Sequence, residues 1–151
     1  MTSRSEIPSP RDPRLDTWRT FLHAHAQVRR QLERELQAEQ SMGLAEYEVL
    51  LSLAYADGGR LRMSDLADRL ALSRSGVTRL VDRLEADGLA GRGSCETDRR
   101  GAWAILTDAG RRRLRDASPT HLRGIGEHFL ERIPFAELES LRRTLSRVVE
   151  D

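Results

Sequence analysis

Apolar side chains recur every three or four positions along most of the chain, a spacing that predicts amphipathic helices. The first such stripe covers residues 15–40 and consists of Leu15, Trp18, Leu22, Val28, Leu32 and Leu36. Gly43 interrupts it, and a second helix continues from residue 44 until Gly58 and Gly59 end it. Residues 1–13 hold three of the five prolines and little to bury, so we expect a flexible tail there.

Residues 60–88 form a series of shorter elements. A strand at residues 60–62 precedes a short helix capped by Ser64, and Ser73 caps a following helix that runs to residue 87, before Gly88. The apolar face of this second helix consists of Val77, Leu80, Val81 and Leu84. Because its other face is polar, the two helices and their tight turn predict a helix-turn-helix. Two ordinary helices with a solvated outer face would show the same pattern.

A β-hairpin is predicted directly after this helix. A strand near residues 89–92, a polar loop at residues 93–101 and a strand at residues 102–106 follow in order. A helix-turn-helix followed by such a hairpin is a winged helix, a mainly α fold with a small β-hairpin wing. We expect the helix to enter a DNA major groove and Arg99 and Arg100, at the hairpin tip, to reach the minor groove or phosphates. Asp98 would repel phosphate, so we expect it to orient an arginine.

Two further helices are predicted after the hairpin. Thr107 caps a long one, and Pro134 separates it from a last helix. The apolar stripes of the two helices consist of Leu114, Ala117, Leu122, Ile125 and Phe129, then Leu138, Leu141, Leu145 and Val148. Any single stripe fits an intramolecular core. Together with residues 15–40, however, they offer more apolar surface than a winged helix of about 65 residues covers, which favours packing between chains.

Composition narrows the class of protein only slightly. The 151 residues carry a net charge of +1, and every basic residue is arginine. Residues 60–83 hold six arginines against three acidic residues, and Arg92 adds to this basic surface, whereas we interpret the arginines at residues 111–115 as a solvated helix face. The lone cysteine excludes an intramolecular disulfide, and neither a membrane-spanning run nor a signal-peptide core is found, so we expect a soluble cytoplasmic protein.

Three stretches of the chain resemble the MarR (multiple antibiotic resistance) family of transcriptional regulators. They read LAEYEVLLSLA, MSDLADRLALSRSGVTRLVDRLEADGLAGR and TDRRGAWAILTDAG. The last is similar to the family's wing, in which an Asp-x-Arg pattern precedes a strand ending in Leu-Thr-x-x-Gly. The resemblance implies a homodimer that binds a near-palindromic operator. It also implies a repressor that is released by a small organic ligand bound between the dimer region and the DNA lobe.

The resemblance also divides the chain and assigns DNA contacts. It implies an N-terminal dimerisation helix at residues 14–43, a winged helix-turn-helix domain at residues 44–107 and C-terminal dimerisation helices at residues 108–151. The expected DNA-binding residues in the second helix of the motif are Ser73, Arg74, Ser75, Thr78, Arg79 and Arg83, the last from its place on the flank of the polar face. In the wing they are Asp98, Arg99 and Arg100, of which Asp98 and Arg100 match the Asp-x-Arg pattern.

What releases such a regulator from DNA is open on sequence grounds. A small organic ligand would have a pocket near the junction of lobe and dimer region, lined by Trp18, His25, Tyr47 and His121. Oxidation of Cys95 in the wing is an alternative, because nearby arginines favour the thiolate. Zinc is a third option, but the four histidines show no helical ligand pair and no evident acidic or cysteine partners, so we expect neither a metal site nor a cofactor.

Two other functional classes fit the sequence less well. An enzyme would need a Gly-rich phosphate loop, a Cys/His nucleophile arrangement or a metal-ligand spacing, and none of these appears. A helical protein-interaction module that does not bind DNA would need an apolar outward face on residues 73–87, and that face is polar. A DNA-binding regulator is therefore the preferred interpretation.

Overall fold

The computed structural model describes residues 7–95 and 98–149, and at residue 95 and residues 98–101 it describes only the backbone. The α-helices are α1 (Arg14–Gln40), α2 (Leu44–Tyr55), α3 (Met63–Leu70), α4 (Arg74–Ala86), α5 (Asp108–His128) and α6 (Phe135–Val149). The strands are β1 (Arg60–Arg62), β2 (Ala90–Cys95) and β3 (Asp98–Leu106), and two 3-10 turns are η1 (Asp57–Gly59) and η2 (Leu130–Arg132). The predicted fold class, a mainly α winged helix-turn-helix, is confirmed.

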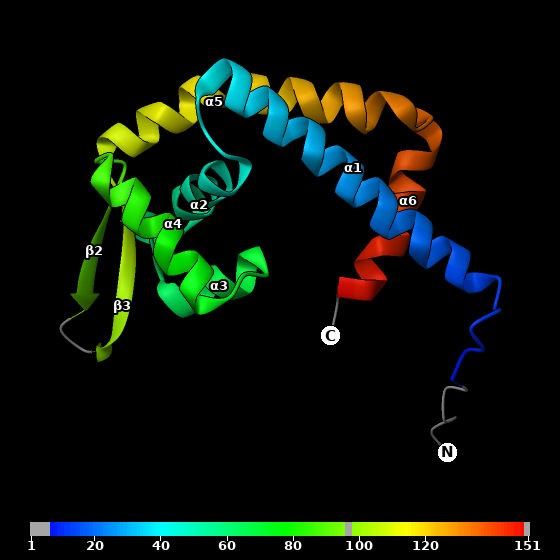
Figure 1. Cartoon of the computed structure of the whole chain (residues 1–151), viewed down its shortest axis with the longest axis horizontal. Helices are drawn as coiled ribbons and strands as arrows, with labels where there is room; N and C mark the ends of the chain where they lie inside the picture. The colour runs from blue at the N-terminus through cyan, green and yellow to red at the C-terminus, as the bar shows by residue number, and fades with distance from the viewer. Residues whose placement is uncertain (1–6, 96–97, 150–151) are drawn as a thin grey trace.

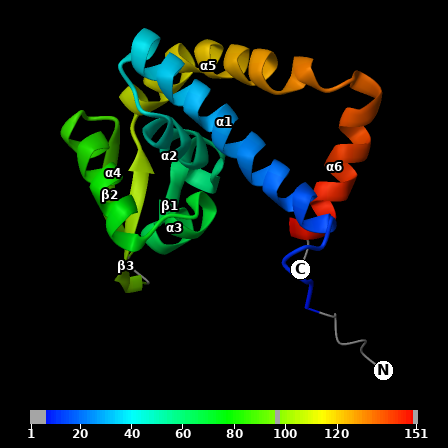
Figure 2. The same ribbon diagram turned by 45° about the vertical axis from the view of Figure 1, so that its right-hand side comes forward.

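The elements are arranged as a lobe and an arm. Helices α2, α3 and α4 and the sheet form the lobe, while α1 and α5 pack against each other above it and extend away from it (Figure 1). Helix α6 turns back from the end of α5 toward the N-terminal half of α1 (Figure 2). None of the described helices is long and apolar enough to cross a membrane.

One apolar core joins the lobe to the arm. Its fully buried side chains include Leu36 of α1, Leu50 of α2, Leu66 of α3 and Leu84 of α4. Ala117 of α5 belongs to the same cluster. Because every helix from α1 to α5 contributes to it, the core fixes the position of the lobe on the arm.

The sheet is antiparallel, with the strand order β1-β3-β2. Arg60 of β1 lies opposite Ile105, and Ala90 of β2 lies opposite Leu106. The prediction of a long loop at residues 93–101 is wrong, because β2 extends to Cys95 and β3 begins at Asp98. Backbone pairing tolerates polar side chains on a solvated hairpin, so polarity alone did not mark the end of the strands.

The helix-turn-helix agrees with the sequence at most of its local signals. Three residues, 71–73, separate α3 from α4, and Ala71 adopts the left-handed conformation at φ 50°. The Ser73 hydroxyl accepts a hydrogen bond from the Gly76 amide at 3.0 Å, and Gly88 has φ 72° after α4, as predicted. Ser64 is not a cap, since α3 begins at Met63 without a side-chain cap.

Apolar side chains lie exposed on both ends of the arm. Trp18 in α1 is 55% exposed and Phe135 in α6 is 90% exposed, and α6 buries none of its residues in this single chain. Leu122 of α5, expected in a buried stripe, is 63% exposed. A hollow of about 460 Å³ beside α6 is lined largely by apolar side chains, including Leu138, Leu141 and Leu145. This surface is the feature expected of a face that packs against another chain.

The junction between wing and α5 is held by two residues of the Leu-Thr-x-x-Gly stretch. The Thr107 hydroxyl donates to the Gly88 carbonyl at 2.7 Å and accepts from the Gly110 amide at 3.0 Å. Gly110 lies so close to the backbone of Leu89 that a Cβ atom would stand 2.0 Å from its carbonyl oxygen. Only glycine therefore fits at this point, and the close approach packs the start of α5 on the end of the α4–β2 connection.

We expect Gly110→Ala to destabilise the protein by about 3 kcal/mol or more, because the new methyl group must push two backbone segments apart. Gly126→Ala, in the same helix, is the matched control. Its Cβ meets only the Glu131 side chain at 3.8 Å, so we expect it to be neutral or to stabilise by about 0.5–1 kcal/mol. Urea unfolding measures both, and equal effects of the two substitutions would contradict the packing described for Gly110.

Candidate nucleic-acid interface

Helix α4 presents a polar face to solvent. Its apolar residues Val77, Leu80, Val81 and Leu84 are buried in the lobe. The exposed residues of the opposite side include all six expected from the sequence, namely Ser73, Arg74, Ser75, Thr78, Arg79 and Arg83. Because burial of the apolar stripe fixes the rotation of the helix about its axis, these side chains are brought together on one outward surface.

The N-terminus of α4 is suited to a negatively charged ligand. Its first amide groups have no partner within the helix, and the helix dipole adds partial positive charge there. Ser73 uses its hydroxyl to cap the Gly76 amide and lies 3.2 Å from the Ser75 hydroxyl. Arg74 adds a full positive charge at the first position of the helix. This end of α4 can therefore receive a phosphate or the electronegative edge of a base.

The arginines of α4 differ in how they are held. Arg79 lines a hollow of about 560 Å³ together with Gly76, Asp82 and Arg83, and it makes no ion pair with any residue that the structure describes. Arg83, in contrast, lies 3.5 Å from the Glu46 carboxylate of α2. Arg79 is thus available to a partner, whereas Arg83 is partly engaged by the lobe.

Arg92 of β2 links the wing to α4. Its guanidinium donates to the Asp82 carboxylate at 2.6 Å and to the Thr78 carbonyl at 3.3 Å. The pair is largely solvent-exposed, so it adds little to stability, but it fixes the angle between hairpin and helix and neutralises an acid on the polar face. The sequence analysis counted Arg92 only as local charge. No spacing rule could have paired Arg92 with Asp82, because the contact depends on how the hairpin folds back.

The sheet adds two more arginines beside the wing. The guanidinium carbons of Arg60 and Arg62, both in β1, lie 5.3 and 5.5 Å from the centre of the Trp103 ring in β3. These distances are those of cation–π contacts. Trp103 therefore holds two positive charges against the base of the hairpin.

The residues predicted at the wing tip are placed only by their backbone. Asp98, Arg99 and Arg100 begin β3, and Cys95 ends β2. Ser94 lies opposite Ala102 whereas Cys95 lies opposite Asp98, so residues 99–101 form an irregularity in β3. The side chains of these residues lie outside the described part of the structure, and their roles stay predictions.

The four residues expected to line an effector pocket fall into two separate ring clusters. The rings of Tyr47 in α2 and His121 in α5 are tilted against each other, with centroids 4.3 Å apart. Trp18 and His25 instead flank Phe21 on α1, at 6.1 and 6.4 Å from its ring. Both clusters have apolar ring surface, but only the Tyr47 cluster lies between lobe and arm.

The Tyr47–His121 pair contains an unused polar atom. Ser118 donates its hydroxyl hydrogen to the Leu114 carbonyl at 2.7 Å, so the Tyr47 hydroxyl is the donor in its 3.1 Å contact with Ser118. The Nδ1 atom of His121 is buried and has no hydrogen-bond partner among the described residues. Burial lowers the pKa of His121, and the nearby Glu48 carboxylate opposes that shift only in part.

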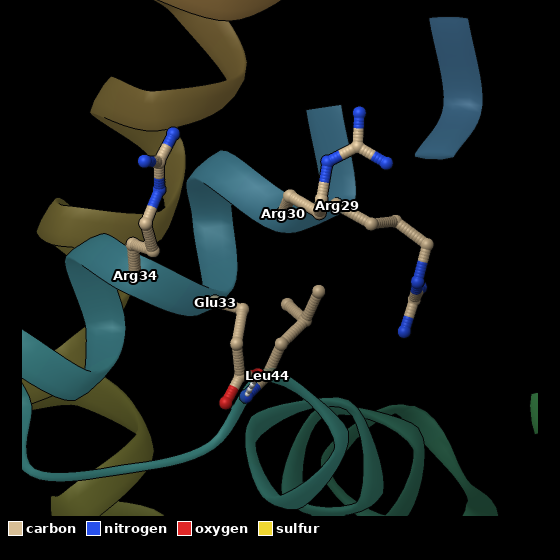
Figure 3. Close-up of a pocket in the computed structure, with 5 residues that line it drawn as sticks. All are labelled: Arg29, Arg30, Glu33, Arg34 and Leu44. Carbon is tan, nitrogen blue, oxygen red and sulfur yellow. Dashed lines mark hydrogen bonds between the residues drawn. The ribbon is translucent and has the colours of Figure 1, made fainter. Parts of the chain in front are cut away.

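A second hollow lies between α1 and the start of α2. Its lining consists of Arg29, Arg30, Glu33, Arg34 and Leu44. Glu33 accepts a hydrogen bond from the Leu44 amide at 2.7 Å and so caps α2, while Arg29 pairs with Glu48 at 2.6 Å. The guanidinium groups of Arg30 and Arg34 point away from Glu33 (Figure 3). The charged groups of this hollow do not converge on a common point, so we assign it a structural role.

Helix α4 presents its polar face outward, and the β2–β3 hairpin follows it directly. This arrangement defines a class of protein, the winged helix-turn-helix DNA-binding proteins. The sequence model of the MarR family matches residues 40–101. An uncharacterized HTH-type transcriptional regulator of Bacillus subtilis, YfiV, is 37% identical over 67 residues, which are 44% of this chain and 41% of that protein. The match therefore spans less than half the length of this curated relative.

Solved structures match over nearly the whole chain. AbsC, a MarR family transcriptional regulator from Streptomyces coelicolor, is 32% identical with a TM-score of 0.82, covering 97% of each chain. Sco3205 from the same organism, solved in complex with DNA, is 32% identical with a TM-score of 0.85, covering 97% of this chain and 91% of its own. CouR from Rhodococcus jostii RHA1, bound to p-coumaroyl-CoA, is 26% identical with a TM-score of 0.76, covering 89% and 92%. The chain belongs to the MarR family of transcriptional regulators.

The lowered pKa of His121 predicts a pH dependence of stability. In an unfolded chain the pKa of histidine is about 6.5. Below that pH the unfolded chain binds a proton that the folded chain does not. The free energy of unfolding therefore decreases as the pH is lowered, until the pH is below the pKa of His121 in the folded state. His121→Phe keeps a ring against Tyr47 and removes this proton, so we expect a shallower loss of stability between about pH 7 and 5. Urea midpoints across this range measure it.

His23→Phe is the matched control for this prediction, because His23 is an exposed histidine of α1. We expect its pH profile to follow that of the wild type. Parallel profiles for wild type and His121→Phe would show instead that other groups cause the acid sensitivity.

Proposed function

We propose that this protein is a homodimeric repressor of the MarR family that binds a near-palindromic operator in the cytoplasm and is released by a small organic effector. The observation that carries the proposal is the outward face of α4, on which Arg79 lies without an ion pair among the described residues. A polar, arginine-bearing helix next to a hairpin wing matches the geometry of major-groove readers. The DNA complex of Sco3205 supports the same partner for this chain.

In this proposal the first turns of α4 read base edges. Ser73 and Arg74 stand at the helix N-terminus, and Ser75, Thr78 and Arg79 follow on the same exposed side. Arginine contacts guanine through two acceptors in the major groove, and hydroxyl groups serve either base edges or phosphates. Arg83, which is tethered to Glu46 further along the helix, is assigned to the phosphate backbone.

The wing contributes affinity more than sequence discrimination in this proposal. The Arg92 contacts to α4 hold the base of the hairpin in place beside the recognition helix. We assign Arg100 to the minor groove, Arg99 to the backbone and Asp98 to orienting Arg100, as the family pattern implies. The minor groove offers a degenerate edge pattern, so contacts there distinguish A·T-rich from G·C-rich flanks and little else.

The dimer is proposed from the apolar arm. The stripe at Leu138, Leu141 and Leu145 lines a hollow and has no cover in the single chain, and Trp18 is exposed on α1. An isologous pairing of these faces would bury both arms and place two recognition helices on one side of the assembly. Two half-sites related by a two-fold axis follow from that symmetry.

The effector is proposed to bind against the Tyr47–His121 pair. The buried Nδ1 atom of His121, unpartnered among the described residues, can serve a polar group of a ligand, and the Tyr47 ring offers apolar surface. CouR, which was solved with p-coumaroyl-CoA, supports a ligand with an aromatic acyl group as one class to test. The competing trigger is oxidation of Cys95, and a Cys95→Ser variant that stays sensitive to peroxide would exclude it.

The direct test is selection of bound sequences from random duplex DNA with the purified protein. We expect a motif with two inverted half-sites and an affinity that falls steeply with salt, because displacement of counterions accompanies each phosphate contact. Recovery of no motif, together with weak binding independent of salt, would favour the protein-interaction module instead.

We expect Arg79→Ala to weaken operator binding by roughly 1–3 kcal/mol and to relax the preference at a single base position in each half-site. The reason is the loss of a two-point contact with one guanine. Arg34→Ala, which removes the same charge from an exposed position of α1, should leave binding nearly unchanged. Fluorescence anisotropy with a panel of operator variants measures the effect. Equal weakening on every variant would identify Arg79 as a phosphate contact.

We expect the double variant Leu141→Asp/Leu145→Asp to be monomeric or unfolded at micromolar concentration, because it places charge in the proposed seam. Sedimentation equilibrium and far-UV circular dichroism distinguish the two results. Thr144→Asp introduces the same charge on an exposed position of the same helix and should remain dimeric. A folded monomeric wild type would overturn the dimer proposal.

A further inference from the structure

A cluster of metal-ligating side chains lies where α1 packs on the last turn of α5. Glu35 comes from α1, and Glu127 and His128 come from α5. One donor atom of each lies within 4.8 Å of the other two. The sequence analysis found no acidic partner for any histidine, and this is wrong for His128, whose Nε2 lies 2.5 Å from the Glu35 carboxylate. The packing of two helices remote in sequence brings them together.

The Glu35 carboxylate is only half used by the protein. Its Oε1 meets His128, while its Oε2 is buried and has no hydrogen-bond partner among the described residues. The Glu35 and His128 side chains are only 23% and 20% exposed. A buried carboxylate oxygen without a partner costs free energy, and a bound cation is one group that would satisfy it.

The backbone of α5 packs closely against this oxygen. Gly124 stands one turn before His128, and a Cβ atom there would lie 2.6 Å from Glu35 Oε2. Any residue larger than glycine would therefore force the Glu35 carboxylate and the Leu32 side chain to shift. The unpartnered oxygen is an observation independent of the clustering itself.

The neighbouring Arg123 pairs closely with Glu39 and only at long range with Glu127. Arg123 donates to the Glu39 carboxylate at 2.5 Å, whereas its Nε lies 3.9 Å from Glu127. Glu127 is exposed, so it stands on the solvent side of the cluster. Glu35 and His128 are partly buried, so the exposed Glu127 is the member of the cluster that a cation from solvent would meet first.

We propose that Glu35, Glu127 and His128 form a binding site for a divalent transition-metal ion of the zinc class. One imidazole nitrogen and two carboxylates are a ligand set that zinc accepts, with water in a fourth position. Metal–ligand bonds of about 2.0–2.2 Å place tetrahedral donors roughly 3.3 Å apart, so His128 and Glu35 separate slightly and Glu127 moves in. Zinc binds a neutral imidazole and ionised carboxylates, so its affinity for such a ligand set falls at low pH.

The bound ion would join α1 to the end of α5, immediately before η2 and α6. This is a different location from both the α4 surface and the Tyr47–His121 pair. The site therefore does not depend on the proposed repressor function, and each can fail without the other.

The test is a titration of zinc sulfate into the full-length protein after chelator treatment and dialysis, followed by calorimetry. We expect one zinc ion per chain and a raised unfolding temperature, because the ion binds the folded state. Cobalt(II) in place of zinc should give the visible absorption of a site with nitrogen and oxygen ligands.

Three variants locate the site. His128→Gln keeps an amide beside Glu35, Glu35→Gln removes the buried charge, and Glu127→Gln changes an exposed residue with little risk to folding. Each should lower zinc affinity on the order of 100-fold or more, since loss of outer-shell partners alone costs about 10–100-fold. His23→Gln, which removes an exposed histidine of α1, should bind zinc as the wild type does.

Two results would overturn the proposal. One is a wild-type protein that takes up no zinc at concentrations well above that of the protein. The other is uptake that Glu127→Gln and His128→Gln leave unchanged, which would place the ion elsewhere. Operator binding by the metal-free protein and the three variants is measured in parallel, so that a failure of the metal site is distinguished from a failure of DNA binding.

Discussion

The close approach of Gly110 to the Leu89 carbonyl is the constraint on which the geometry of the DNA lobe depends. At this point the connection between α4 and β2 meets the start of α5 backbone to backbone, with the Leu106 side chain beside the contact. Thr107 closes the same junction, because its backbone amide donates to the Leu89 carbonyl at 3.3 Å and its hydroxyl donates to Gly88. The recognition helix is thereby attached to the arm through backbone contacts, which are stiffer than contacts between long side chains.

For the proposed effector response, this junction offers a route by which a change in the arm would reach the DNA surface. Helix α5 begins at the junction and carries His121 about three turns later. The His121 ring lies tilted against that of Tyr47 in α2. A ligand that separates the two rings would move α5 against the lobe, and the rigid junction would transmit that movement to α4 and the wing. The physical requirement is a different affinity of the ligand for the two arrangements of lobe and arm.

Charge is distributed according to the same architecture. On the outward face of α4, Asp82 pairs with Arg92, and Arg83 pairs with Glu46. Beyond the first turn of α4, Arg79 is therefore the arginine that has no ion-pair partner among the described residues. Arginines of the arm pair with acids of neighbouring helices, as Arg29 of α1 does with Glu48 of α2 and Arg123 of α5 does with Glu39 of α1. A net charge of +1 therefore conceals a lobe surface and an arm with different electrostatic roles.

The sequence by itself determined the features that depend on neighbours three or four positions away. The caps at Ser73 and Thr107 and the left-handed Gly88 are local hydrogen bonds and backbone preferences, and all three were predicted correctly. Tertiary structure alone decided which remote side chains meet. It extended the strands past the predicted loop, joined Arg92 to Asp82, separated Trp18 from Tyr47 and brought Glu35 to His128. These contacts depend on the angles and positions at which helices and the hairpin pack against one another. The spacing of residues within a single element does not specify that packing.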